Sequence, residues 1–125
     1  MATIMVVEDN PDNMKLFRTV LALKGHRVIE RGDGEGLLDA LAQAQPDLVL
    51  MDIQLPGRDG FALLQEIRDS DTPGYRVVAL TAHAMAGDLE RALAAGFDGY
   101  LTKPVDIRRL PHQVVRALNG EQVTE

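Results

Sequence analysis

Short apolar runs alternate along the chain with longer segments of helical spacing. Runs of aliphatic and β-branched residues are typical of strands that are buried on both faces of a sheet. One of these segments has only two apolar residues between charged ones, which suits a strand at the edge of a sheet. The strands that this pattern predicts are residues 3–7, 26–30 (the edge candidate), 48–51, 77–81 and 99–102.

A helix is expected after each of these strands. Asn10 is a favourable cap and Pro11 a favourable first residue, and Gly25 is a typical helix stop. Pro111 lies several residues into the last helix if Asp106 caps it, so we expect an irregular or late start there. The predicted helices are residues 11–24, 35–44, 60–69, 84–95 and 106–119.

The alternation of strands and helices predicts an α/β fold with a five-stranded parallel sheet. Right-handed crossovers would cover both faces of that sheet, which gives an open, doubly wound domain. With 125 residues the chain has the size of one ordinary domain. We therefore expect a single domain over residues 1–120 and a frayed tail over residues 121–125.

Composition and charge exclude several classes of protein. Hydrophobic residues make up 46% and charged residues 26%, a balance typical of a globular protein rather than a disordered one. The absence of cysteine removes disulfide and thiolate chemistry and fits a reducing compartment. No apolar run approaches the roughly 18 residues that a membrane span needs, and we expect a cytoplasmic protein with no membrane contact. The net charge of −6 argues against nucleic-acid binding.

Chemically active residues follow the predicted strands. The apolar run at 48–51 leads directly into Asp52, and a buried carboxylate needs solvent, a cation or hydrogen bonds to keep its charge. Ligands of parallel α/β sheets bind at the edge formed by the carboxyl ends of the strands. The residues expected at that edge are Glu8, Asp9, Asp52, Thr81 and Lys103.

Three carboxylates in one shallow pocket repel one another, and a divalent cation bound through oxygens relieves that repulsion. Mg²⁺ fits best, because it takes one or two protein carboxylates and keeps positions open for phosphate oxygens. Thr81 and Lys103 supply a hydroxyl and a compact cation that suit a phosphoryl group. The pocket is therefore expected to support phosphoryl transfer to an acid.

Each of these residues also has an ordinary structural explanation. Asp52 alone would most often be a helix cap or turn former, and Thr81 a strand residue. Lys103 alone would be an exposed lysine, while Glu8 and Asp9 would favour the positive end of a helix. The combination, with a suitable group after four of the predicted strands, favours a functional site.

Four motifs resemble those of the receiver domains of bacterial two-component signalling, the CheY-like response regulators. The resemblance runs from about residue 2 to residue 119, and its nearest forms are DivK-type stand-alone receivers and the receiver domains of hybrid kinases. The motifs are VVEDN at 6–10, LVLMDIQLPGRDG at 48–60, ALTA at 79–82 and GYLTKP at 99–104.

The resemblance implies a flavodoxin-like strand order of 2-1-3-4-5 and a phosphoacceptor at Asp52. The donor would be a phosphohistidine of a sensor histidine kinase or histidine phosphotransfer protein. Asp9, Asp52 and the backbone carbonyl of Gln54 would hold Mg²⁺, or Mn²⁺ in its place. Glu8, where the family often has aspartate, would assist through water, and Lys103 would neutralise the phosphoryl charge.

The resemblance also implies a switch. Thr81 would move toward the phosphoryl group, Ala82 would let the loop approach, and Tyr100 would turn into the vacated space. A downstream protein would then bind the region Asp88–Leu118, and the chain would be a monomer or a weak phosphorylation-dependent dimer. Gln54 and His83 would tune the access of water, so that dephosphorylation is slow. The chain would be a phosphoacceptor rather than an enzyme.

Other interpretations stay open at this stage. The chain would also suit an interaction module that works without phosphorylation, or a receiver fragment of a hybrid histidine kinase. A magnesium-dependent phosphatase with Asp52 as nucleophile is disfavoured, because Gln54 stands where such enzymes place a second acid. A flavodoxin-like cofactor carrier is disfavoured because EDNPDN follows the first strand, where a phosphate-binding loop would be needed.

Overall fold

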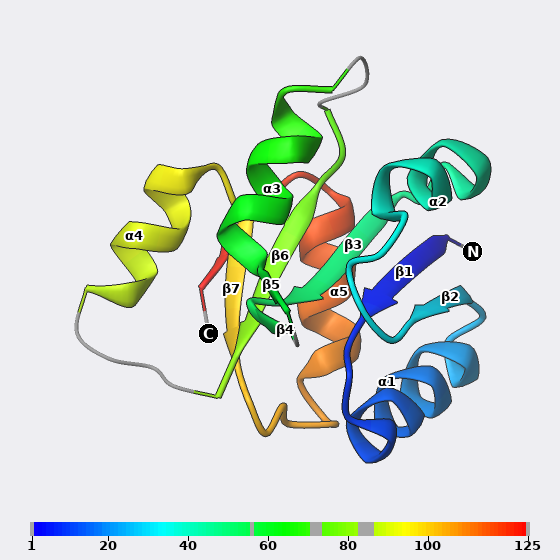
Figure 1. The fold of residues 1–125 in the computed structure, drawn as a ribbon. Helices are drawn as coiled ribbons and strands as arrows, with labels where there is room; N and C mark the ends of the chain where they lie inside the picture. The colour runs from blue at the N-terminus through cyan, green and yellow to red at the C-terminus, as the bar shows by residue number, and fades with distance from the viewer. Residues whose placement is uncertain (1, 56, 71–73, 83–86, 125) are drawn as a thin grey trace.

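A computed structural model describes residues 2–55, 57–70, 74–82 and 87–124. Figure 1 shows its strands and helices along the chain. No helix in these described ranges combines the length and the apolar character that crossing a bilayer would need. The strands of the main sheet are β1 (Thr3–Val7), β2 (Arg27–Arg31), β3 (Leu48–Asp52), β6 (Val77–Thr81), β7 (Gly99–Thr102) and β8 (Val123–Thr124). The helices are α1 (Pro11–Leu23), α2 (Leu37–Ala44), α3 (Gly60–Arg68), α4 (Asp88–Ala95) and α5 (Leu110–Leu118).

The main sheet is parallel, with the strand order β2-β1-β3-β6-β7-β8. Its first five strands have the predicted order, because β6 and β7 are the fourth and fifth strands that the sequence predicted. β2 lies at one edge, as the scarcity of apolar residues in this strand indicated. A small antiparallel hairpin, β4 (Gln54–Leu55) and β5 (Arg58–Asp59), lies in what the sequence suggested was only a turn.

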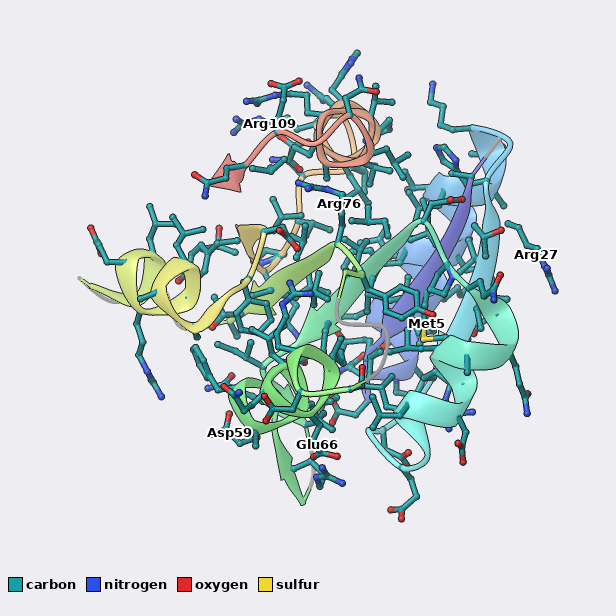
Figure 2. The ribbon with its side chains drawn as sticks, turned by 90° about the horizontal axis from the view of Figure 1, so that it is seen from above. Met5, Arg27, Asp59, Glu66, Arg76 and Arg109 are labelled. Atoms are coloured by element: carbon teal, nitrogen blue, oxygen red, sulfur yellow. The ribbon has the colours of Figure 1, made fainter. Side chains whose placement is uncertain are left out.

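Helices cover both faces of the sheet, and Figure 2 shows the three layers from above. α2, α3 and α4 contribute to one buried cluster, which includes Met5 and Met51 from the central strands. α1 and α5 contribute to a second cluster on the other face, which includes Ile4 and Leu50. Alternate residues of β1 and β3 therefore face opposite clusters, which explains the unbroken apolar runs 4–7 and 48–51 in these strands.

The residues that were expected to set the starts of the first and last helices do so in the structure. The side chain of Asn10 accepts hydrogen bonds from the backbone N–H groups of Asp12 and Asn13, at 2.9 and 3.1 Å, and Pro11 begins α1. α5 begins only at Leu110, so Pro111 lies in its first turn, where a missing N–H costs no intrahelical hydrogen bond. The predicted late start is thus confirmed. The expected start of the fourth helix, at residues 84–86, lies outside the described residues.

The prediction of a frayed tail over residues 121–125 is wrong for the residues that the structure describes. Val123 is only 1% exposed, and β8 pairs in parallel with β7. Gly120, with φ +92°, ends α5 and turns the chain back along the sheet. A two-residue strand with one apolar side chain has no periodicity to detect, so the sequence pattern gave no sign of it.

Gly60 offers a test of how tightly the fold fixes the chain after β3. Its N–H donates to the carbonyl of Ile53 at 3.1 Å, and an added Cβ would collide with the backbone of Ile53. We predict that Gly60→Ala lowers the free energy of unfolding by about 2 kcal/mol, measured by urea denaturation. Gly32→Ala, where an added Cβ meets nothing within 4 Å, is the control. Equal stability of the two variants would contradict the prediction.

Candidate functional site

The carboxyl ends of four strands meet at one edge of the sheet and bring the expected residues together. Glu8 and Asp9 follow β1, Asp52 ends β3, Thr81 ends β6 and Lys103 follows β7. All of these residues except Thr81 line a cavity of about 460 Å³. It is lined by Glu8, Asp9, Asn10, Asn13, Asp52, Gln54, Ala82, Lys103 and Pro104.

Lys103 forms the central contact of the site. Its Nζ lies 2.7 Å from Oδ2 of Asp52 and 2.9 Å from Oε1 of Glu8. Both acidic residues are only 2% exposed, so the ammonium compensates two buried carboxylates at once. The apolar run of β3 can therefore end in a buried carboxylate, because the charge of Asp52 is paired with a cation that follows another strand.

Burial and pairing act on the pKa values in opposite directions. Burial raises the pKa of Glu8 above its usual value, although hydrogen bonds from Lys103 and from the backbone of Asn10 oppose the rise. Burial alone would lower the pKa of Lys103, but its hydrogen bonds to Asp52 and Glu8 outweigh that effect and raise the pKa. Lys103 therefore stays protonated as the counterion of the pocket.

Backbone groups fix the two buried carboxylates. Oδ1 of Asp52 accepts the N–H of Gln54 at 2.7 Å, and Oε2 of Glu8 accepts the N–H of Asn10 at 3.1 Å. The β4–β5 hairpin pairs Gln54 with Asp59, which is also the cap of α3. The loop after Asp52 is therefore held by strand pairing and by a helix start, which preorganises the acid.

The acidic residues fit a divalent cation. Glu8, Asp9 and Asp52 each offer an oxygen, and these three atoms lie within 4.8 Å of one another. Asp9 is exposed and so gives access from solvent, while the other two acids are buried. Carboxylate oxygens at one edge of a shallow cavity are the ligands that Mg²⁺ prefers. The donor set thus fits the metal that the sequence indicated.

Of the residues expected to take part in switching, Ala82 lines the cavity, Thr81 directly precedes it in the chain, and Tyr100 is buried in the core. Thr81 is 1% exposed, and its carbonyl accepts the N–H of Lys103 at 2.7 Å. Ala82 is exposed and lines the cavity. Tyr100 is only 5% exposed and belongs to the cluster on the α4 side of the sheet, so its ring is already buried in this structure. His83 lies outside the described residues.

Sequence reasoning did not select Asn10, Asn13 and Pro104 as residues of the site, yet all three line the cavity. Asn10 was assigned only as a helix cap, a role that it does have. Asn13 follows it by three positions, the spacing that places two side chains on the same side of a helix. Because α1 begins directly after the acidic pair, Asn13 in its first turn stays near these acids, and this closeness in sequence was the available signal.

Comparison with known proteins identifies a family whose model covers the site. Residues 4–115 match the family model of the response regulator receiver domain. The chain is 41% identical over 108 residues to the polar-differentiation response regulator DivK of Brucella anthropi, covering 86% of this chain and 88% of that relative. It is 40% identical to DivK of Brucella ovis over the same shares of the two chains.

Solved structures show the same fold. The receiver domain of a sensor histidine kinase from Pseudomonas aeruginosa, with a magnesium ion in its active-site cleft, superposes with a TM-score of 0.84. It is 34% identical and the match covers 94% of this chain and 98% of that one. A two-component response regulator from Aurantimonas has a TM-score of 0.88 at 30% identity, covering 98% and 89%.

The family match runs from β1 into α5 and includes all three residues of the acidic site, Glu8, Asp9 and Asp52. This chain belongs to the response regulator receiver domain family.

Proposed function

We propose that this chain accepts a phosphoryl group on Asp52 from a histidine kinase or a histidine phosphotransfer protein and signals by binding another protein. The observation that carries the proposal is the position of Asp52. Its carboxylate faces a cavity, contacts Lys103 at 2.7 Å and lies beside two further acids. Membership of the receiver family supports the same chemistry.

In the proposed reaction an oxygen of Asp52 attacks the phosphorus atom of a phosphohistidine. The new O–P bond forms as the P–N bond breaks, and the imidazole nitrogen leaves with the electron pair. The Gln54 N–H holds the other carboxylate oxygen at 2.7 Å, which orients the attacking oxygen. Lys103 carries the positive charge that the phosphoryl oxygens require, so it would exchange one carboxylate contact for the phosphoryl group.

Glu8, Asp9, Asp52 and the backbone carbonyl of Gln54 are the groups that would hold Mg²⁺, or Mn²⁺ in its place. When bound, the ion supplies charge neutralisation at the phosphoryl group. Support comes from the three carboxylate oxygens within 4.8 Å of one another and from the magnesium ion in the related Pseudomonas receiver. Glu8 would act on the ion through water, because both of its carboxylate oxygens are already hydrogen-bonded, Oε1 to Lys103 and Oε2 to the N–H of Asn10.

Signal output would use Thr81, Ala82 and Tyr100. Thr81 ends β6 beside the cavity and shares a backbone hydrogen bond with Lys103, so a shift at the phosphoryl group reaches β7 directly. The region Asp88–Leu118 would bind the downstream protein in one of the two states. Self-catalysed hydrolysis would end the signal slowly, at a rate tuned by Gln54 and His83.

Asp52→Asn tests the acceptor. Acetyl phosphate with Mg²⁺ should add one phosphoryl group to the unsubstituted chain and none to this variant, as measured by intact mass spectrometry. The change is nearly isosteric, so the circular dichroism spectrum should be unchanged. Asp47→Asn is the control, because Asp47 lies before β3 and bonds the N–H of Thr3 away from the cavity. Uptake by Asp52→Asn at the original rate would show that the acceptor is another residue.

Asp9→Asn tests the metal site. Losing one of three convergent carboxylates should weaken Mg²⁺ binding by about tenfold or more, measured by isothermal titration calorimetry. Asp47→Asn should bind the ion like the unsubstituted chain. An unchanged affinity in Asp9→Asn would mean that the ion does not use this acid.

Lys103→Met tests the counterion. Its loss leaves two buried carboxylates without a cation, so the free energy of unfolding without metal should fall by about 3 kcal/mol, measured by urea denaturation. Arg18→Met breaks the exposed pair with Glu30 and should cost less than about 1 kcal/mol. Phosphoryl uptake should also fall in Lys103→Met but not in Arg18→Met. Similar stability losses in the two variants would contradict the central place of Lys103.

A further inference from the structure

Residues 120–124 form a part of the fold that lies beyond the family match at residues 4–115. Their strand, β8, extends the sheet by one strand at the β7 edge. In Figure 1 this red segment runs beside the yellow β7, next to α4. β8 is therefore not part of the matched family domain, and its contacts are the guide to its role.

A specific turn directs the segment to β7. The N–H of Gly120 donates to the carbonyl of Ala117 at 3.1 Å, and the N–H of Glu121 donates to the carbonyl of Arg116 at 3.0 Å. This pair of bonds is the Schellman pattern, which needs a residue with positive φ after the helix cap. Gly120 provides it with φ +92°. The end of α5 thus sets the direction of the segment.

The segment is anchored by burial and by a close backbone approach. Val123 is 1% exposed and packs in the cluster that contains Val78, Leu101 and Val114. Gly99 lies opposite Val123, and a Cβ on Gly99 would stand 2.7 Å from the carbonyl oxygen of Val123. The absence of a side chain at Gly99 is therefore what allows β8 to pair at this position.

Arg76 adds a polar anchor from the start of β6. Its Nε donates to the carbonyl of Ala117 at 2.6 Å and its Nη2 to the carbonyl of Glu121 at 3.2 Å. Nη1 lies 3.9 Å from Asp98, which also accepts the N–H of Val77 at 2.8 Å. Figure 2 shows Arg76 on the α5 side of the sheet. One guanidinium thus joins the segment to the amino ends of β6 and β7.

This arrangement places β8 against the strand that carries Tyr100. Tyr100 pairs with Ala79 of β6 on one side and with Thr124 of β8 on the other, and its ring is only 5% exposed. Without β8, β7 would be the edge strand and the ring of Tyr100 would have open solvent beside its own strand. With β8 in place, that edge is paired and Thr124 lies opposite Tyr100, while Val123 anchors β8 on the other face of the sheet.

We propose that residues 120–124 are a strand latch that holds Tyr100 in its buried position. The latch would bias the chain toward the state in which Tyr100 is turned inward, and this second step depends on the proposed function. Coupling between two sites is reciprocal, so a closed latch and a phosphoryl group on Asp52 would favour each other. Opening the latch would then weaken binding of a phosphoryl analogue at Asp52.

Tyrosine fluorescence tests the latch without reference to phosphorylation. The chain has two tyrosines and no tryptophan, so Tyr75→Phe leaves Tyr100 as the single emitter. In that background, Val123→Asp places a charge in the buried cluster and should release β8. Acrylamide quenching of Tyr100 should then rise toward that of free tyrosine amide. Val115→Asp, the same change on the exposed side of α5, should leave the quenching unchanged.

A second variant separates the release of β8 from any direct effect of the charge that Val123→Asp introduces. Gly120→Val disfavours the positive φ that turns the chain, so it should raise the quenching of Tyr100 through a different residue. Far-ultraviolet circular dichroism should show that all variants keep their helices. The latch is overturned if Tyr100 remains as shielded in both Val123→Asp and Gly120→Val as in the parent chain.

Beryllofluoride with Mg²⁺ tests the coupling to Asp52. Its affinity should fall about tenfold in Val123→Asp and stay unchanged in Val115→Asp, measured by the change of Tyr100 emission on titration. An increase of quenching without any loss of beryllofluoride affinity would overturn the coupling. If the parent chain binds no beryllofluoride, the proposed function fails, whereas the quenching experiment still decides whether the latch exists.

Discussion

The structure depends on a partly buried lysine whose ammonium pairs with two buried acids from different strand ends. Lys103 follows β7, and its ammonium contacts Asp52 at the end of β3 and Glu8 after β1. The apolar strands can deliver carboxylates into the interior only because this cation arrives from across the sheet. The same charges that stabilise each other in the fold make a pocket that suits a phosphoryl group and a metal ion, so stability and chemistry share one set of residues.

Much of this arrangement could be predicted from the sequence. The apolar strands and their alternation with helices predicted the doubly wound fold, and the family resemblance implied the strand order. The parallel sheet then brought Glu8, Asp9, Asp52, Thr81 and Lys103 to one edge. Chain-order reasoning works here because parallel strands end on the same side of the sheet. Which groups contact each other could not be predicted, since that depends on rotamers and on distances between strands.

β8 could not be predicted from the sequence, because a strand of two residues shows no periodic pattern. β8 has a single buried apolar residue, Val123, and its place relies on Gly99 having no side chain and on the hydrogen bonds of Arg76. A receiver whose fifth strand is covered by its own chain has a different edge to offer to a partner, so β8 would take part in setting the output surface.

Chemical mapping of the modified residue tests most directly whether Asp52 is the phosphoacceptor. The chain is treated with acetyl phosphate and Mg²⁺, the product is reduced with borohydride, and its peptides are sequenced by mass spectrometry. An acyl phosphate on an aspartate is reduced to homoserine, so we predict homoserine at position 52 and at no other aspartate. Homoserine at another position, or phosphate retained on a histidine, would contradict it.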